Sequence, residues 1–467
     1  MKGASRRLRL AFELLRAEGP RGHAERLAER VETLSTRLEE TAVPLERFAE
    51  AAGQVRALDV LASPLAPRWG GVPTQLLARR AEEERLWPTA LVAPEAGRWT
   101  LRVTRQGTRL RTRLGPCGDV ARSGWVGGGP GADGRDAVAT VVEAARLVGA
   151  EIVNVEGAAG WPLAALRALA GREPRLVVSL HDFALFCPRP NLVEEPQARF
   201  CGYSTDGERC RVCLAATWRL PPGFLEAWRR EATELLAAAH AIVYPSSFLL
   251  ARHATLFPGP RGGLEQVIEP VAPGGGTSAP APATRAVGRE GPARVAFVGA
   301  FRPHKGARVF RDLVTRREVA GRPVEWSILG SGDAALSREV RGSGVRVAGH
   351  YRAGSLARRL QEEDVDVALL LSVWPETYSL TLTECRAAGV PVLAFGHGAI
   401  AERIAAEGGG LVVPVENGAE AIAGMLEKVL SGELAVPPFR GGPAGPSARG
   451  AAAARSRLYR TLLGEAT

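Results

Sequence analysis

Residues 372–394 have the sequence SVWPETYSLTLTECRAAGVPVLA, and this stretch decides the interpretation of the chain. An apolar strand ends near Leu371, a loop carries Glu376, and a helix begins near Ser379 and contains Glu384. The VPVLA segment then predicts the next buried strand. A helix that starts directly after a strand presents unpaired N–H groups and the positive end of its dipole, which bind phosphate oxygens. We therefore expect a phosphate site there, with the two glutamates within reach of hydroxyl groups beside it.

Strands and helices alternate in the same way along most of the chain, which predicts βαβ units and parallel sheets. A stretch rich in Pro, Gly, Ala, Ser and Thr separates two such regions. We expect a helical extension over 1–56, a first Rossmann-like domain over 57–272, a linker over 273–292, a second domain over 293–436, and a tail with a terminal helix over 437–467. In the first domain we expect strands at 58–62, 89–93, 151–155, 176–180, 241–244 and 265–268. The 467 residues suffice for two cores with a ligand cleft between them.

The composition, with 46% hydrophobic and 24% charged residues, is that of a water-soluble globular protein. It excludes disorder, collagen-like repeats and disulfide-stapled miniproteins. The formal net charge is +10, although Lys2, Lys305 and Lys428 are the only lysines. This excess of positive charge suits an anionic ligand or surface as the partner. Because the arginines are spread along the whole chain, we expect no nucleic-acid partner.

The amino-terminal segment does not have the pattern of a membrane span or a signal peptide. No apolar run approaches the roughly 20 residues that a span needs. Glu13 interrupts the first apolar stretch, so we expect a cytoplasmic protein. Leu8, Ala11, Phe12 and Leu15 share one helical face beside several arginines. This face fits two alternatives, a helix packed on its own protein or peripheral contact with the inner face of the membrane.

A second motif, FVGAFRPHKG, occupies residues 297–306. A strand runs into a loop with Arg302 and Lys305 and then into a helix, which suits neutralisation of a leaving diphosphate. A lysine in a chain that uses arginine almost everywhere indicates that its compact point charge matters. The alternative is a loop with two solvated cations. Gly330, in LGSGD after an expected strand at 324–329, predicts a turn where the backbone can approach a nucleotide.

Two features of the first domain lie at the ends of expected strands. Gly70 and Gly71 open a helix without a G-x-G-x-x-G pattern, so the sequence disfavours a dinucleotide site, and an ordinary turn is the alternative. His181 and Asp182 follow the strand at 176–180, on the edge where doubly wound domains present ligand groups. A lone histidine is more often structural, and Asp182 either orients it or caps the next turn.

Glu376 and Glu384 stand eight positions apart. Together with AAGVPV at 387–392, this E-x7-E pattern resembles the motif of the retaining GT-B glycosyltransferases, family GT4. The segment FGHGAIAER at 395–403 is similar to that family's glycine-bearing turn, and the resemblance extends over about residues 57–435. It implies an α/β fold of GT-B architecture, in which two doubly wound parallel-sheet domains face a cleft, here with an N-terminal helical extension.

The resemblance also implies roles for individual residues. In this comparison Glu376 and the backbone of Tyr378, Ser379 and Leu380 hold the donor sugar and diphosphate, and Glu384 binds the nucleotide ribose. Arg302 and Lys305 neutralise the leaving group, and His181 contacts the donor sugar. The backbone can approach the ligand closely at Gly70, Gly71 and Gly330. The expected catalytic group is Glu376, His181, Lys305 and Arg302. Ser379 stands where many relatives have glycine, which leaves the fine placement of the donor open.

The reaction that the resemblance implies is transfer of a hexose from a nucleotide-sugar to an acceptor hydroxyl, with retention and without a metal cofactor. The leaving phosphate is expected to deprotonate the acceptor. The family implies a glycan or lipid-linked acceptor in surface polysaccharide or glycolipid assembly. A GT-B epimerase or phosphorylase is an alternative, which the E-x7-E pattern and the lack of an evident Schiff-base lysine disfavour. A non-catalytic scaffold that binds anionic ligands is the other.

Four of the six cysteines, Cys187, Cys201, Cys210 and Cys213, occupy one loop of the first domain, residues 187–213. Four thiolates can close a tetrahedral structural zinc site, and the Cys-x-x-Cys end has the spacing of half a zinc knuckle. Buried reduced thiols and a redox pair are the alternatives. The loop follows His181 and resembles a subset of GT4-like sequences, so a structural clip near the acceptor site is the favoured hypothesis.

Overall fold

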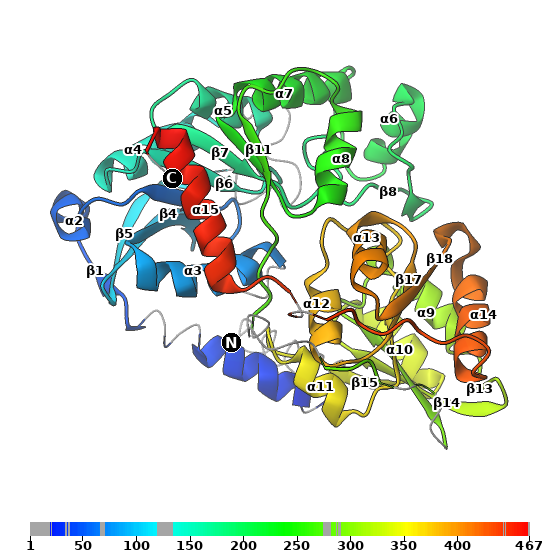
Figure 1. Cartoon of the computed structure of the whole chain (residues 1–467). Coiled ribbons are helices and arrows are strands. Elements are labelled where there is room, and N and C mark those ends of the chain that lie inside the picture. Colours follow the sequence, from blue (N-terminus) through cyan, green and yellow to red (C-terminus); the bar gives the residue numbers. More distant parts are fainter. Residues whose placement is uncertain are drawn as a thin grey trace, which may run out of the picture. The chain divides into compact units, whose positions relative to one another are not determined.

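The computed structural model describes residues 19, 21–32, 35, 38–65, 71–118, 134–273, 282–285, 287, 291–441, 443 and 445–465. The chain divides into two compact units. Unit 1 contains Ala272–Gly445 and the described part of Met1–Leu34, and unit 2 contains Ser35–Val271 and the described part of Pro446–Thr467. Each end of the chain therefore belongs to the unit formed by the opposite half of the sequence, as the colours in Figure 1 show.

Unit 1 is built around a seven-stranded sheet within the described residues. Its strands are β12 (Ala293–Val298), β13 (Glu318–Val319), β14 (Arg322–Leu329), β15 (Arg346–Gly349), β16 (Val367–Leu370), β17 (Val392–Phe395) and β18 (Gly410–Val413). Its helices are α9 (Ala307–Leu313), α10 (Ala334–Gly342), α11 (Leu356–Glu362), α12 (Leu380–Ala387), α13 (Gly398–Glu407) and α14 (Gly418–Leu430), with 3-10 turns η2 (Pro303–Lys305) and η3 (Val415–Asn417).

The parallel strands of unit 1 lie in the order β15-β14-β12-β16-β17-β18, and the short β13 pairs antiparallel with β14. Alternate residues of β12 face opposite layers. Val295 and Phe297 join a core cluster with α9 and α14, whereas Ala296 and Val298 join a second cluster with α11 and α12. A strand that is apolar on both faces is typical of a parallel sheet covered by helices on both sides.

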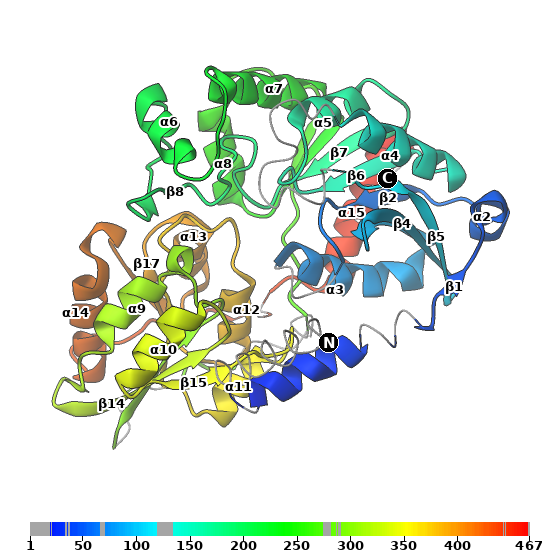
Figure 2. The same ribbon diagram turned by 180° about the vertical axis from the view of Figure 1, so that it is seen from behind.

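Residues 21–32 form a helix that packs beside α11 of unit 1 (Figures 1 and 2). Glu25 accepts hydrogen bonds from the Arg352 backbone N–H at 2.8 Å and from Arg359 Nη1 at 3.1 Å. Arg26 Nη2 donates to Ser331 Oγ at 3.0 Å, in the loop that follows β14. This part of the amino-terminal extension is therefore fastened to unit 1 by its charged face.

Unit 2 contains a nine-stranded sheet and a separate two-stranded ribbon among its described residues. Its strands are β1 (Thr41–Ala42), β2 (Ala57–Val60), β3 (Thr89–Glu95), β4 (Arg98–Arg105), β5 (Thr108–Pro116), β6 (Ile152–Glu156), β7 (Arg175–Ser179), β8 (Val193–Glu194), β9 (Arg199–Phe200), β10 (Ala241–Tyr244) and β11 (Leu264–Val267). Its helices are α2 (Leu45–Ala52), α3 (Gly71–Leu86), α4 (Arg135–Leu147), α5 (Leu163–Ala170), α6 (Gly207–Ala215), α7 (Phe224–Ala238), α8 (Ser247–Leu256) and α15 (Ala448–Leu463).

The large sheet of unit 2 has the order β1-β5-β4-β3-β2-β6-β7-β10-β11, and the strands from β3 to β11 in that order are parallel. The carboxy-terminal helix α15 packs against α3 on this sheet (Figure 1). Its residues Leu458 and Tyr459 are buried in a cluster with Val177 and Val243 of the sheet. The terminal helix is therefore part of the unit 2 core.

Strands β4 and β5 lie between the strands expected at 89–93 and 151–155 and were not among the expected strands. Strand β4 pairs antiparallel with β3, and β5 pairs antiparallel with β4. Ala96, Gly97, Gln106 and Gly107 all have positive φ, as two-residue hairpin turns require. Six arginines within Arg98–Pro116 interrupt the apolar positions and conceal the strand pattern.

The expected helical extension over 1–56 is also only partly helical in its described residues. Thr41 and Ala42 form β1, which pairs with Leu110 and Arg111 of β5. Within the expected linker, Arg285 donates to the Val365 carbonyl at 3.0 Å, so this part packs on unit 1. None of the helices in the described ranges is both long and apolar enough to cross a membrane. The amphipathic face expected within residues 1–15 lies outside the described residues.

Candidate active site

The strand order of unit 1 reverses its direction of growth between β12 and β16. Ligands of open α/β sheets bind at the carboxyl edge beside such a switch point. The loop after β12 carries Lys305 and the loop after β16 carries Glu376, and Lys305 Nζ lies 2.9 Å from Glu376 Oε1. The fold therefore brings together the two charged motifs that the sequence places 71 positions apart.

Glu376 is a buried carboxylate that its surroundings keep ionised. Burial opposes ionisation, but Lys305 and a hydrogen bond from Ser372 outweigh it and hold the pKa of Glu376 below its usual range. Lys305 Nζ also lies 5.3 Å from the centre of the Trp374 ring, within the range of a cation–π contact. The result is a preformed ion pair at the edge of the sheet.

The glycine-bearing turn at 395–399 supports the Glu376 loop from behind. The Ala399 N–H donates to the Glu376 carbonyl at 2.7 Å, and His397 Nε2 lies 2.7 Å from the Ser372 carbonyl oxygen. A Cβ on Gly398 would lie 2.7 Å from the backbone N and O of Glu376, so only glycine fits there. The turn is thus a structural support for the loop that carries the acid.

The first turn of α12 begins at Ser379, which has φ +77° and ψ +90°. This left-handed backbone favours glycine, and a residue with a Cβ is strained in it. The Ser379 hydroxyl partly compensates because it accepts from the Leu382 N–H at 3.3 Å and caps the helix. Arg403 donates to the Ser379 carbonyl at 2.9 Å and to Thr383 Oγ1 at 3.0 Å. Tyr378 packs its ring under the same guanidinium, at 4.3 Å.

Glu384 lies on α12, about one turn beyond Leu380, and only 8% of its surface is exposed to solvent. Burial raises the pKa of Glu384 to about 7, against the opposing effect of hydrogen bonds from the Leu356 and Gly354 N–H groups. Among the described residues, no donor reaches Glu384 Oε1. A buried acceptor atom without a donor is costly to a protein and indicates a ligand contact.

Gly330 and Arg302 lie on neighbouring loops of the same edge. A Cβ on Gly330 would come within 1.8 Å of the Gly299 carbonyl oxygen, so the loops after β12 and β14 touch through their backbones. The Arg302 side chain is exposed, and its carbonyl accepts from the Lys305 N–H at 2.9 Å. Arg302 therefore fixes the turn that carries Lys305, while its guanidinium stays in solvent.

Unit 2 holds the remaining predicted residues. His181 follows β7, and its Nε2 lies 2.8 Å from Glu156 Oε2 at the end of the adjacent strand β6. Asp182 accepts from the Ala184 N–H at 2.8 Å, so it caps the next turn. Gly71 is the first residue of α3, whereas Gly70 lies outside the described residues.

Glu156 is the centre of a buried polar cluster. Arg79 Nη1 lies 2.7 Å away, Asn154 Nδ2 donates at 2.7 Å, and Arg455 of α15 lies 3.9 Å away. Burial raises the pKa of Glu156, but Arg79, His181 and Arg455 together hold it well below the usual value. An ionised Glu156 accepts the hydrogen bond from His181 Nε2, and this bond fixes the orientation of the imidazole ring.

Several residues that contact the Glu376 site of unit 1 or His181 of unit 2 belong to no recognisable sequence motif. Ser372, Trp374 and Arg403 contact Glu376, Lys305 and the start of α12, and Glu156 orients His181. Glu156 ends a strand at the same edge as His181, and that shared edge is the signal that could have identified it. Unit 1 brings together Lys305, Glu376, Tyr378, Ser379, Leu380, Glu384, Gly330 and Arg302, and unit 2 contains Gly71 and His181.

Replacement of Ser379 separates backbone strain from helix capping. Ser379→Gly removes strain of about 1–2 kcal/mol and loses little as a cap, so stability is unchanged or rises by up to about 1 kcal/mol. Ser379→Ala keeps the strain and loses the cap, so stability falls by about 1 kcal/mol. Urea unfolding of the three proteins checks the order. An alanine variant as stable as the glycine variant would show that the positive φ carries no strain.

Comparison with known proteins agrees with this geometry. Residues 292–432 match the model of the family described as Glycosyl transferases group 1. None of the curated proteins matches the chain in a sequence comparison. Sucrose-phosphate synthase from Thermosynechococcus elongatus is similar in structure, with a TM-score of 0.56 at 13% identity, over 88% of this chain and 100% of that chain.

Two further solved structures show the same arrangement. OtsA has a TM-score of 0.52 at 10% identity, over 88% of this chain and 96% of its own. The catalytic domain of starch synthase IV from Arabidopsis thaliana, bound to ADP and acarbose, has a TM-score of 0.51 at 12% identity, over 88% and 100%. At these identities the likeness shows the fold, and the expected two-domain α/β architecture is confirmed. The chain therefore has the two-domain GT-B fold of these enzymes, and its residues 292–432 match the model of the glycosyl transferases group 1 family.

Proposed function

We propose that the protein transfers a sugar from a nucleoside diphosphate sugar to an acceptor hydroxyl with retention of anomeric configuration. The observation that supports this most strongly is the group of charges at the unit 1 switch point. It combines an ion-paired Lys305 and Glu376, a helix start at Ser379 and an acceptor atom on Glu384 that lacks a donor. A cation, a helix N-terminus and a hydroxyl acceptor are the groups that a nucleoside diphosphate needs.

The donor lies along α12 in this proposal. Its diphosphate meets the N–H groups at the start of the helix together with Lys305 and the exposed Arg302, and a ribose hydroxyl donates to Glu384 Oε1. Gly330 lets the nucleotide approach the loop backbone. The ADP bound to the starch synthase IV domain supports a ligand of this class.

The chemical step breaks the bond between the sugar C1 and the β-phosphate oxygen, and the bonding electrons go to that oxygen. Lys305, Arg302 and the helix start stabilise the negative charge that develops there. The acceptor oxygen forms a bond to C1 from the face that the phosphate leaves, and its proton passes to the departing phosphate. Glu376 holds hydroxyl groups of the sugar, so no side chain has to act as a general base.

His181 serves as a second contact to the donor sugar in this proposal. Glu156 acts through His181 and is a positioning residue, because its hydrogen bond to Nε2 fixes the tautomer and the ring orientation. The glycan or lipid-linked acceptor, the metal independence and the cytoplasmic location stay predictions from the sequence, as does a peripheral membrane contact of residues 1–15.

Nucleotide binding is the first test of the proposal. UDP, GDP, dTDP, CMP and ADP are compared by thermal shift without metal, and one nucleoside diphosphate at about 100 times its Kd adds about 2.7 kcal/mol of stability. Lys305→Ala weakens binding roughly tenfold to a hundredfold, because a charged hydrogen bond contributes about 1.5–3 kcal/mol. Lys428→Ala is the matched control, since this exposed lysine of α14 lies outside the site.

With the sugar form of that nucleotide, nuclear magnetic resonance shows the product with the anomeric configuration of the donor. Inversion would contradict retention while leaving the nucleotide site intact. A folded protein that binds no nucleotide would instead favour the scaffold alternative and remove the basis of the proposal.

The raised pKa of Glu384 predicts a pH dependence of binding. A ribose hydroxyl that donates to Glu384 favours the carboxylate, so binding lowers its pKa and affinity increases with pH up to about 7. We expect a rise of roughly tenfold between about pH 6 and about pH 8, measured by titration calorimetry. In Glu384→Gln, the only remaining pH dependence of the affinity is the one that comes from titration of the nucleotide phosphate.

The same pKa predicts a change in stability. Because the folded protein binds this proton more tightly than the unfolded chain, the stabilising contribution is present below about pH 4.5 and is lost as the pH rises to about 7. Glu384→Gln does not lose this stabilising contribution. The difference in melting temperature between the variant and wild type therefore shifts in favour of the variant from pH 5 to pH 8. An identical pH profile of the two proteins in both measurements would contradict the assignment.

Glu156→Gln tests the positioning of His181. We expect kcat to fall about tenfold with little change in KM, because the donor still binds to unit 1 while the histidine loses its orientation. Glu83→Gln is the matched control, because Glu83 pairs with the same Arg79 at 3.2 Å and is also buried. It shares the stability loss and keeps kcat. Equal loss of kcat in both variants would assign Glu156 a purely structural role.

A further inference from the structure

The four cysteines of the 187–213 loop line one small cavity in unit 2. The cavity has a volume of about 20 Å³, and Cys187, Cys201, Cys210 and Cys213 all border it. Each of the four is a free thiol. Residues as far as 26 positions apart in sequence thus border the same cavity, which the spacing alone does not require.

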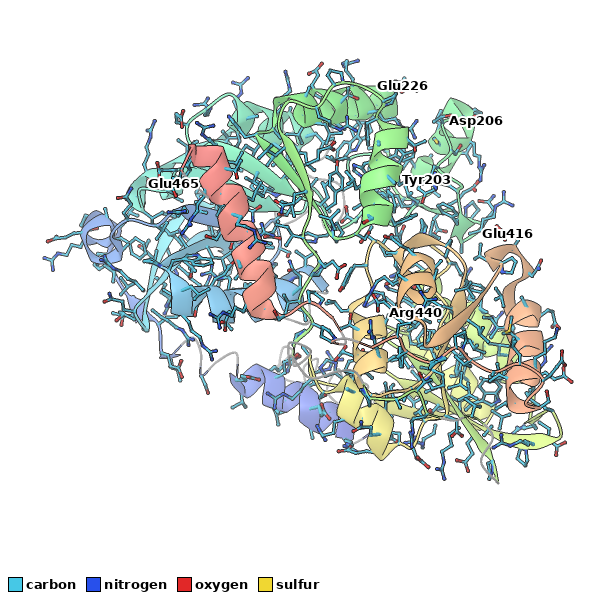
Figure 3. All side chains as sticks on the ribbon, in the orientation of Figure 1. Tyr203, Asp206, Glu226, Glu416, Arg440 and Glu465 are labelled. Carbon is cyan, nitrogen blue, oxygen red and sulfur yellow. The ribbon has the colours of Figure 1, made fainter. Side chains whose placement is uncertain are left out.

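The segment around this cavity has little other core. From residue 195 to residue 212 no residue is buried, although the segment contains β9 and most of α6. Helix α6 buries only Cys213 and Leu214. It lies at the outer edge of unit 2 in both views (Figures 1 and 2), and Tyr203 and Asp206 mark the segment in Figure 3. Ordered structure with so few buried apolar groups is typical of segments held by a metal or disulfides.

Backbone N–H groups are already directed at the sulfurs. The Arg189 N–H donates to Cys187 Sγ and the Glu195 N–H donates to Cys213 Sγ, each at 3.4 Å. Cys201 receives backbone hydrogen bonds from Ser204 and Tyr203. Turns in which the N–H of a following residue points at a cysteine sulfur stabilise thiolate charge and orient it towards a cation.

Cys210 and Cys213 complete the arrangement from α6. They stand three residues apart on one face of the helix, so both can reach the cavity. Within the described residues, no group of three or more His, Cys, Asp and Glu side chains is arranged to hold a metal ion as it stands. Ligation therefore requires the thiols to turn inward, and a cysteine needs rotation about only one side-chain torsion to do so.

We propose that Cys187, Cys201, Cys210 and Cys213 form a structural site for one Zn²⁺ ion. Four soft thiolates with no open position match tetrahedral zinc, and the ion neutralises part of their negative charge. Each thiol loses its proton to solvent when it binds. Burial raises the pKa of Cys187 to about 12, so the metal-free Cys187 thiol is neutral at pH 7.

The site also connects to the loop that carries His181. The Cys187 N–H donates to the Phe183 carbonyl at 3.0 Å, and the Phe183 N–H donates to the Pro190 carbonyl at 3.1 Å. Phe183 is two residues beyond His181. Zinc thus holds the far end of the loop whose near end presents the histidine, and this role does not depend on the reaction proposed above.

Metal analysis of the whole chain tests the site. Protein produced with zinc in the medium and purified under reducing conditions contains about one zinc per chain by mass spectrometry, as does Cys117→Ala, the control at a buried cysteine outside the loop. Cys201→Ser and Cys210→Ser contain less than about a tenth of that amount. If these variants do not fold, replacement of zinc by Co²⁺ in the wild-type protein shows the charge-transfer and d–d bands of tetrahedral cobalt thiolate.

Three results would overturn the proposal. One is a folded, reduced wild-type protein that binds neither zinc nor cobalt. Another is a disulfide between any two of the four cysteines in the freshly purified protein. The third is zinc that Cys201→Ser and Cys210→Ser retain at the wild-type level.

Discussion

The ion pair between Lys305 and Glu376 is the interaction on which the arrangement of unit 1 depends. It joins the loops on the two sides of the strand-order reversal, at 2.9 Å. A buried carboxylate without a cation would lose its charge, because the low dielectric of the interior disfavours the ionised form. The pair keeps Glu376 ionised until a ligand arrives, and it holds Lys305 close to the start of α12. The close approach of the two loops also requires glycine at position 306, because a Cβ there would lie 2.0 Å from the Leu371 carbonyl oxygen.

Unit 2 also keeps a buried carboxylate ionised, with different residues. Arg79 contacts both Glu156 and Asp59 at 2.7 Å, and the ionised Glu156 in turn orients His181 at the edge of the sheet. In each unit a buried acid next to the carboxyl ends of parallel strands contacts a long cationic side chain, Lys305 in unit 1 and Arg79 in unit 2. Removal of that cation would leave an uncompensated buried charge, which costs far more than an exposed pair contributes. Both sites are therefore formed before any ligand binds, and little of the binding energy is spent on ordering them.

The sequence predicted the parts of the fold that depend on periodicity and on short motifs. The strands of the second half follow the expected alternation closely, and the loops with Lys305 and Glu376 meet where parallel strands end. The hairpin β4–β5 escaped prediction because its arginines conceal the apolar positions, although Gln106-Gly107 is a turn signal. The contact of Arg26 with Ser331 escaped as well, since a charged helix carries no information about its partner.

Ser379 and Glu156 show a different limit. Ser379 departs from the glycine of many relatives, and only the backbone angle shows that the left-handed conformation is kept and that the hydroxyl became a helix cap. Glu156 belongs to no motif, because its role comes from the neighbouring strand and from Arg79, which lies 77 residues away in the sequence. Residues that act through packing or hydrogen bonds between distant segments are invisible until the sheet order is known.

The most direct test of the central claim is a crystal structure of the protein with the nucleoside diphosphate that it binds best. The account predicts the diphosphate at the start of α12, a ribose hydroxyl within hydrogen-bond distance of Glu384 Oε1, and Lys305 Nζ in contact with a phosphate oxygen. A nucleotide bound elsewhere in the protein, or bound at this edge without contact to either Lys305 or Glu384, would contradict it.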